Sequence, residues 1–266
     1  MAICNDDFDG KFQWDIAIVG ILRILEHVLR LETEKLKYFI SAPFGNYIKL
    51  PDTISVTGSW TYQKRTGLFP QILKTLRYTK DGWVNKIGLR NAGIIDGLKR
   101  TRSSEVLSLA AIDKYDWISL DSRVPSDVSV EINISCPNLD KDVGAVSLEG
   151  FDIWPNSKRK WCICKIPPTS SNDLIDQIVD NGYTQIHASN TLYSLHGGQS
   201  GKVLTPYTNR IIQYIKHKHP HVTVIAGGGV MNKKDADDYF DRGADYVSLG
   251  SVCFTPWKLI DILKKG

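Results

Sequence analysis

The residues best suited to chemistry in this chain lie in one octapeptide, Glu131-Ile-Asn-Ile-Ser-Cys-Pro-Asn138. The segment from Val128 to Ile134 predicts a buried strand, which Pro137 ends because proline cannot donate to a strand ladder. The strand would bring Asn133 and Cys136 to one point at its C-terminal end. A thiol held between carboxamides could exchange a proton with a polar, planar ligand. The alternative is a buried cysteine beside two turn-forming asparagines.

Glycines and a lysine follow other apolar runs. Gly227-Gly228-Gly229 comes after one run and Gly250-Ser251 after the next. Glycine lets backbone N–H groups approach an anion closely, so paired turns of this kind favour a phosphate site over simple tight turns. Lys165 ends a third run, and its ammonium would either reach solvent or pair with buried negative charge.

The composition excludes several classes of protein. The 266 residues are 42% hydrophobic and 23% charged, which is typical of one soluble globular domain. A net charge of +4 with scattered basic pairs does not indicate nucleic-acid binding. The five cysteines lack Cys-x-x-Cys spacing, so we expect no disulfide framework, no metal site and a reducing, cytoplasmic location.

Strand-like and helix-like segments alternate along the chain, which predicts an α/β fold, a (β/α)8 TIM barrel, with functional residues just past the strand C-termini. The helices are less clear in the first half, and residues 143–154 offer the one helix candidate directly after the octapeptide. The expected strands are Tyr38–Ala42, Ile54–Val56, Val106–Ala111, Val128–Ile134, Trp161–Ile166, Thr184–Ala188, Val222–Ala226 and Tyr246–Leu249, and the clearest helices are Asn172–Asn181, Pro206–His217, Lys233–Arg242 and Pro256–Lys264.

We expect residues 1–37 to form an N-terminal amphipathic helical extension and residues 38–266 to form the barrel. The apolar stretch from Trp14 to Leu31 is interrupted by ionisable residues, which makes it too charged to span a bilayer. It would pack across the bottom of the barrel, and a membrane-surface helix is the alternative. The aspartates among the first dozen residues do not predict a signal peptide.

The octapeptide resembles the Asn-x-Ser-Cys-Pro-Asn signature of dihydroorotate dehydrogenases, flavin enzymes of pyrimidine biosynthesis. The resemblance implies an FMN-dependent barrel oxidoreductase that acts on a CH–CH bond and oxidises dihydroorotate to orotate. It recurs in order from about Ser41 to Leu259, in the segments 84–93, 165–168, 188–191, 197–201 and 225–230.

The resemblance also implies roles for matching positions. Cys136 would be the catalytic base that removes a proton from C5 of dihydroorotate while a hydride leaves C6 for the flavin, and Lys165 would lie against the flavin ring. Uncharged amides suit the edge of a uracil-like ring, although each could be a turn residue. The positions expected to bind substrate are Asn85, Gly88, Leu89, Asn133, Asn138, Asn190, Thr191 and Lys49, and those expected to bind FMN are Ala42, Gly45, Gly58, Ser59, Asn133, Lys165, Ser189, Gly198, Ser200, Gly201, Gly228, Gly229, Gly250 and Ser251.

The sequence departs from the family pattern at the lysine expected near the orotate carboxylate. Gly58 stands where the cytosolic class has that lysine, and Lys49 is the nearest candidate for the lysine of the membrane-bound class. Cys136 resembles the cytosolic class, whereas residues 58–61 and 197–201 resemble the membrane-bound class. The chain is therefore a hybrid, and the loop that covers the cysteine in the family is shortened here.

Two other functions remain open. A tRNA-dihydrouridine synthase-like enzyme would also be an FMN barrel with a catalytic cysteine, but it would need a basic face and usually an RNA-binding domain after the barrel. A barrel that binds FMN or a pyrimidine without turnover is favoured by the missing lysine and opposed by Cys136. We expect a small-molecule substrate and no nucleic acid; the sequence names no electron acceptor, and a homodimer is an open expectation.

Overall fold

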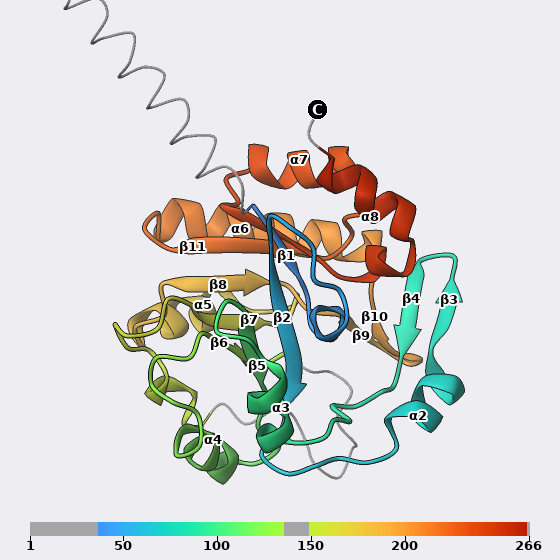
Figure 1. Cartoon of the computed structure of the whole chain (residues 1–266). Helices are drawn as coiled ribbons and strands as arrows, with labels where there is room; N and C mark the ends of the chain where they lie inside the picture. Colours follow the sequence, from blue (N-terminus) through green and yellow to red (C-terminus); the bar gives the residue numbers. More distant parts are fainter. Residues whose placement is uncertain (1–36, 136–148, 265–266) are drawn as a thin grey trace, which may run out of the picture. The chain divides into compact units, whose positions relative to one another are not determined.

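A closed barrel of parallel strands forms the centre of the protein, as the sequence predicts (Figure 1). The computed structural model describes residues 37–135 and 149–264. Around the barrel the strands follow the order β1-β12-β11-β8-β7-β6-β5-β2. Their bounds are β1 Tyr38–Ile40, β2 Thr53–Trp60, β5 Val106–Leu109, β6 Val130–Asn133, β7 Cys162–Ile166, β8 Gln185–Ala188, β11 Thr223–Gly227 and β12 Tyr246–Leu249.

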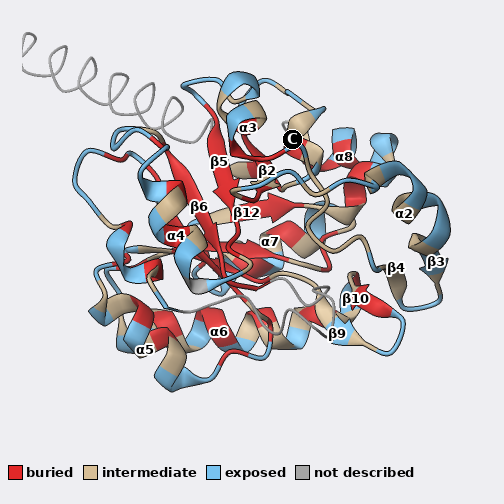
Figure 2. Cartoon of the chain, turned by 90° about the horizontal axis from the view of Figure 1, so that it is seen from below, coloured by how far each residue is buried: buried red, intermediate tan, exposed pale blue. Residues whose placement is uncertain are grey.

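Helices follow most of the barrel strands and cover their outer faces. In Figure 2 the barrel strands are buried, while helices α5 and α6 show buried stripes that alternate with exposed ones, as expected of amphipathic helices on a core. The helices are α2 Leu68–Thr75, α3 Ile94–Arg100, α4 Lys114–Asp121, α5 Asn172–Asp180, α6 Thr205–Lys218, α7 Lys233–Asp241 and α8 Pro256–Leu263, and short 3-10 turns are η2 Phe44–Asn46, η3 Phe151–Ile153, η4 Lys202–Leu204 and η5 Ser251–Phe254.

Side-chain caps fix where two of these helices begin. The Ser171 hydroxyl accepts a hydrogen bond from the Leu174 N–H at 3.2 Å at the start of α5. The Asn232 carbonyl oxygen accepts one from the Asp235 N–H at 3.0 Å at the start of α7. Such caps satisfy N–H groups that have no partner inside the helix. The caps therefore fix the residue at which each preceding loop, at the C-terminal end of the barrel, ends and the helix begins.

A small antiparallel sheet stands beside the barrel and was not predicted from the sequence (Figure 1). Its order is β3-β4-β10-β9, so hydrogen bonds between β4 and β10 join segments that lie far apart in the chain. The bounds are β3 Arg77–Thr79, β4 Gly82–Asn85, β9 Leu192–Ser194 and β10 Gly197–Gln199. This pairing brings Asn85, at the end of β4, to the segment that follows β8.

The inside of the barrel has an apolar lower layer. The rings of Phe39, Trp161 and Tyr246 meet edge to face, with centroid distances of 5.1, 5.5 and 5.3 Å for the three pairs. All three residues lie at or near the N-terminal ends of barrel strands, and isoleucines and valines complete the cluster. Edge-to-face aromatic contacts of this kind are favourable beyond the area that they bury.

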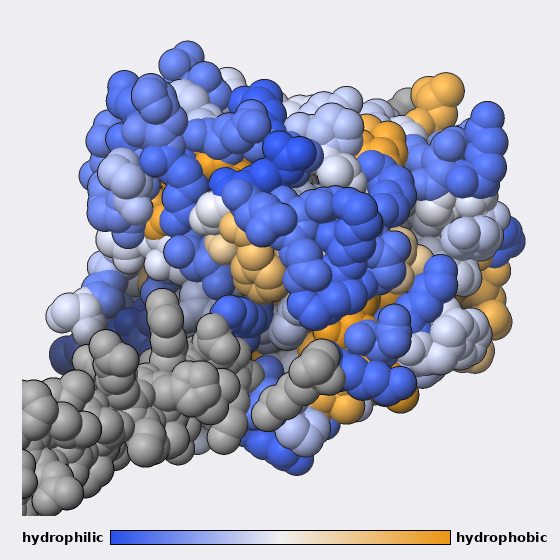
Figure 3. All heavy atoms as spheres, turned by 90° about the horizontal axis from the view of Figure 1, so that it is seen from above, coloured by the Kyte–Doolittle hydropathy of each residue, from blue (hydrophilic) through white to orange (hydrophobic). Residues whose placement is uncertain are grey.

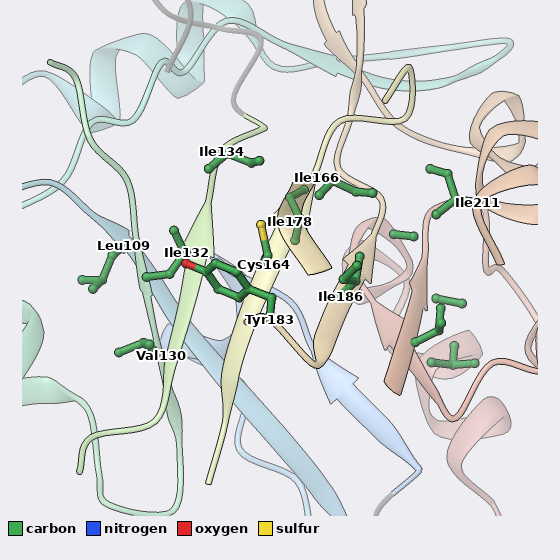
Figure 4. Packing of buried hydrophobic residues seen from close by; sticks show 14 of the residues in the cluster. Leu109, Val130, Ile132, Ile134, Cys164, Ile166, Ile178, Tyr183, Ile186 and Ile211 are labelled. Carbon is green, nitrogen blue, oxygen red and sulfur yellow. The ribbon is translucent and has the colours of Figure 1, made fainter. Parts of the chain in front are cut away.

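A second apolar core lies between the strands and the surrounding helices (Figure 4). Ile132 and Cys164 point outward from β6 and β7, and Tyr183 lies across them. Ile178 of α5 packs beside Ile166. Because alternate residues of a strand face opposite sides, Glu131 and Asn133 must then point into the barrel.

The exterior is mostly hydrophilic on the face shown in Figure 3, where apolar side chains form separate small groups. Within residues 37–135 and 149–264, no helix is both long and apolar enough to cross a membrane. The predicted helical extension of residues 1–37 lies outside the described residues, except for Lys37, as does most of the segment 143–154, of which the structure describes the 3-10 turn η3.

Candidate active site

A cavity of about 760 Å³ opens at the C-terminal end of the barrel. Residues from the ends of many barrel strands line it, among them Ser41, Ser59, Asn133 and Lys165, and α2 with the small sheet extends its wall. Barrel enzymes place their reacting groups at this end, and a cavity of this size is large enough for a cofactor with a substrate. The cavity is therefore the candidate active site.

The turn after β11 can hold an anionic group. Gly228 and Gly229 line the cavity and have φ of 89° and 79°, a conformation that other residues rarely adopt. A Cβ on Gly229 would lie 2.6 Å from Thr205 Oγ1, and one on Gly228 would lie 2.8 Å from Leu204 Cβ. Among the described residues neither glycine N–H donates a hydrogen bond to a protein group. A phosphate would supply the acceptors that these N–H groups lack.

Below the cavity, three ionisable side chains form a buried group in the upper layer of the barrel. The Glu131 carboxylate is 2.7 Å from His187 Nδ1 and 3.8 Å from Lys165 Nζ, and it accepts a hydrogen bond from Ser108 at 2.8 Å. The side chains of Glu131, Lys165 and His187 are at most 5% exposed. Buried charges are stable only when they are paired, as Glu131 and Lys165 are here.

The protonation states of this group follow from its contacts. Burial alone would raise the pKa of Glu131, but the positive charge of Lys165 and the contacts with His187 and Ser108 outweigh burial and lower this pKa to about 2. Burial and the repulsion of Lys165 lower the pKa of His187. At neutral pH Glu131 is therefore ionised and His187 is neutral, with its proton on Nδ1, where it donates to the carboxylate.

A chain of hydrogen bonds connects this group with Asn133, Ser135 and Asn190. Ser108 Oγ is 2.8 Å from Ser59 Oγ, which accepts from Asn133 Nδ2 at 2.8 Å. The side-chain oxygen Oδ1 of Asn133 accepts from the Ser135 N–H and hydroxyl at 3.1 and 2.6 Å, and Asn190 Nδ2 donates to Ser135 Oγ at 2.9 Å. These bonds hold both carboxamides in place, and among residues 37–135 and 149–264 one N–H of Asn133 and Oδ1 of Asn190 have no hydrogen-bond partner and could bind a ligand.

Comparison with known proteins agrees with this geometry. The family described as dihydroorotate dehydrogenase matches residues 45–266. The chain belongs to the dihydroorotate dehydrogenase family. It is 30% identical over 243 residues to a protein of Thermotoga petrophila named dihydroorotate dehydrogenase B (NAD(+)), catalytic subunit, with 80% of this chain and 88% of that protein covered.

More distant relatives extend the comparison. A protein of the same name from Oceanobacillus iheyensis is 24% identical over 220 residues, covering 70% of this chain and 72% of its own. The crystal structure of a ligand-free dihydroorotate dehydrogenase from Eimeria tenella has a TM-score of 0.60 at 17% identity, covering 79% of this chain and 75% of that one. The latter similarity supports the barrel fold alone.

Most positions that the family resemblance singled out line the cavity. Cys136 and Asn138 lie outside the described residues, whereas Ser135, directly before them, is fixed between Asn133 and Asn190. Burial raises the pKa of Cys162 and Cys253 to about 12, so neither thiol could serve as a base at neutral pH. The predicted positions that line the cavity are Ala42, Gly58, Ser59, Asn85, Gly88, Leu89, Asn133, Lys165, Ser189, Asn190, Thr191, Ser200, Gly228, Gly229, Gly250 and Ser251.

Lys49 and Gly45, two of the predicted positions, do not line the cavity. Lys49 Nζ forms an ion pair at 2.7 Å with Glu105, a buried carboxylate before β5. Gly45 packs η2 against β2, because a Cβ there would come within 2.2 Å of the Val56 carbonyl oxygen. The chain therefore uses Lys49 for a salt bridge and Gly45 for close backbone packing.

Gly198 and Gly201 also lie away from the cavity lining. Gly198 is a residue of β10, paired with Asn85 and Tyr193 in the small sheet. Gly201 has φ of 114°, and a Cβ there would lie 2.6 Å from the Asp81 carbonyl oxygen. Both glycines serve the packing of the small sheet, which places the wall of the cavity.

Glu131, His187 and Ser108 were not predicted as site residues. Glu131 opens the octapeptide and lies two positions before Asn133, so period-two alternation already placed it on the inner face of the strand. His187 is aligned with Lys165 in the register of β7 and β8. For Glu131 and His187, the available signal was an ionisable residue within a predicted buried strand.

Proposed function

We propose that this protein is an FMN-dependent enzyme that oxidises dihydroorotate to orotate, with Cys136 as the base. The observation that carries the proposal is the cavity of this family member, which is lined by a buried lysine, two fixed carboxamides and two glycines whose N–H groups have no acceptor within the described part of the chain. Each feature matches one part of the expected ligands: an electron-accepting ring, a planar pyrimidine and a phosphate.

The residues expected to hold FMN fit the group. The N–H groups of Gly228 and Gly229 would bind its phosphate, and the Lys165 ammonium would face its ring system. Bound FMN would accept the hydride that leaves C6 of dihydroorotate. Glu131 would direct the Lys165 ammonium, with which it forms a buried ion pair, and His187 and Ser108 in turn orient the Glu131 carboxylate.

The substrate would be oriented by side chains that are already fixed. The remaining N–H of Asn133 and Oδ1 of Asn190 present one donor and one acceptor to a ring whose edge alternates N–H and C=O. Cys136 would take the proton from C5, and its place in the chain next to Ser135 supports that role. Orientation of this kind can supply a large part of a rate enhancement because the reacting atoms need not search for alignment.

Anaerobic addition of L-dihydroorotate to the purified protein tests the proposal. We expect yellow protein with about one FMN per chain and loss of the oxidised flavin absorbance on mixing. Dihydrouracil, which lacks the carboxylate, serves as the matched control and should reduce the flavin far more slowly. Colourless protein that also fails to bind added FMN would contradict the proposal, and so would a flavin that dihydroorotate leaves oxidised.

A further inference from the structure

Cations line the cavity, and no carboxylate does so among the described residues. The cationic side chains of the lining are Lys64, Arg65, Arg90, Arg100 and Lys165. A pocket with charge of one sign attracts ligands of the other sign. The lining therefore favours an anion, and the question is which of these cations would contact it.

Three of these cations already face an acid. Arg65 has an interaction partner in the chain, and its positive charge opposes the rise that burial causes in the pKa of Asp116. Lys64 is exposed to solvent. The other two pairs are Arg100 with Asp96 at 2.8 Å and Lys165 with Glu131 at 3.8 Å.

Arg90 differs from the other cations. Its Nη1 donates to the Thr66 carbonyl oxygen at 2.8 Å, and among the described residues it forms no ion pair. Its Nε is buried and has no hydrogen-bond partner in the described part of the chain, which is also true of the Nε atom of Arg65, but Arg65 acts on Asp116 and Arg90 faces no acid there. A buried N–H without an acceptor is unfavourable, and Nε together with Nη2 forms the edge of a guanidinium that matches the two oxygens of a carboxylate.

The loop that carries Arg90 is firmly held. The backbones of Asn91 and Arg65 exchange hydrogen bonds of 2.9 and 3.0 Å, which ties this loop to the one after β2. The Asn91 side chain donates to the Leu89 carbonyl oxygen at 2.7 Å and accepts from the Gly93 N–H at 2.8 Å. A side chain that starts from a fixed backbone loses less conformational entropy when a ligand binds.

We infer that Arg90 binds the carboxylate of the anionic pyrimidine through its Nε–Nη2 edge and so determines specificity for orotate over neutral pyrimidines. This inference rests on the proposed function. It assigns to Arg90 the role for which the sequence offered Lys49, since the Lys49 ammonium is paired with Glu105.

The test compares orotate with its methyl ester, which keeps the ring and most of the size but lacks the charge. Affinities would be measured by titrating each ligand into the FMN-loaded protein and following the flavin spectrum. In Arg90→Gln we expect orotate affinity to fall about ten- to hundred-fold and ester affinity to change little, because a charge-assisted bidentate contact is lost. Arg90→Lys should recover part of the loss. Arg242→Gln, a change at an exposed arginine that does not line the cavity, is the charge-matched control, and its orotate affinity should stay near that of the wild type.

The outcomes separate the inference from the proposed function. Wild-type flavin that dihydroorotate reduces, combined with unchanged orotate affinity in Arg90→Gln, would overturn the inference and leave the function standing. Equal losses of orotate and ester affinity in Arg90→Gln would also overturn it, because they would indicate a structural role for Arg90. A wild-type protein that neither binds orotate nor is reduced by dihydroorotate would overturn both.

Discussion

Replacing Glu131 by glutamine should destabilise the protein more than any comparable change at its surface. Gln keeps the shape of the side chain but removes the charge that faces Lys165, and its amide nitrogen would place a donor opposite either His187 Nδ1 or Lys165 Nζ. The Lys165 ammonium, with its side chain 5% exposed, would then lack a counter-charge in the dry interior. Breaking a buried pair in this way costs about 3–5 kcal/mol of unfolding free energy.

The pKa of Glu131 gives an independent magnitude. Its fall from the ordinary 4.5 to about 2 corresponds to roughly 3 kcal/mol of stability when the group is ionised. Because the folded pKa lies below the unfolded one, this contribution is complete above about pH 4.5 and is lost as the pH falls toward 2. The difference between the wild type and Glu131→Gln should therefore be constant near neutral pH and narrow in acid.

Urea unfolding at pH 7, followed by circular dichroism with the same excess of FMN in every sample, measures this difference, because bound ligand raises apparent stability. The matched control is Glu105→Gln. Its partner Lys49 is 29% exposed and stays solvated, so we expect a smaller loss, on the order of 1 kcal/mol. A loss in Glu131→Gln no larger than in Glu105→Gln would refute the view that Glu131 compensates a buried charge.

Two further predictions concern the base and the buried histidine. Cys136→Ser should slow flavin reduction at neutral pH far more than it weakens orotate binding, because a serine hydroxyl is a much weaker acid than a thiol. Part of the reduction rate should return at higher pH. Equal losses in the stopped-flow reduction rate and in orotate affinity would indicate a packing role for Cys136 instead. The folded pKa of His187 lies below its unfolded value of 6.5, so the unfolded chain takes up the proton first and stability should fall as the pH drops below about 6.5. His187→Gln should flatten that part of the stability curve in urea titrations, and a curve as steep as that of the wild type would place the acid sensitivity elsewhere.

The sequence predicted the barrel because its strands are buried on both faces and so read as apolar runs. It underestimated β2, predicted as Ile54–Val56 and observed as Thr53–Trp60, because the end of that strand carries the polar residues that line the cavity. The small sheet was missed because its strands are three or four residues long and are stabilised by pairing between distant segments. Short-range patterns contain no information about such pairing.

The sequence predicted residues of the cavity lining where a motif lies at the end of a strand. It did not predict contacts between residues that lie far apart in the chain. Asn133 is the last residue of β6, Lys165 lies one residue before the end of β7 and Gly228 follows β11, so the predicted strand ends were enough to place all three at the cavity. The ion pair of Lys49 with Glu105 was not predicted, because Glu105 lies in another loop and nothing local to Lys49 signals that contact. Such contacts depend on how the strands close into a barrel, which is a property of the whole chain.

The edge-to-face rings of Phe39, Trp161 and Tyr246 fill the inside of the described barrel near the N-terminal ends of its strands. Water does not cross such a layer readily, because the tightly packed rings offer it no hydrogen-bonding partners. Small molecules would then enter and leave the described barrel at its C-terminal end. The C-terminal opening would then serve dihydroorotate, orotate, the released proton and the eventual oxidant of the flavin alike. Orotate would therefore have to leave through the same opening by which the oxidant reaches the flavin, and product release and flavin reoxidation would follow one another.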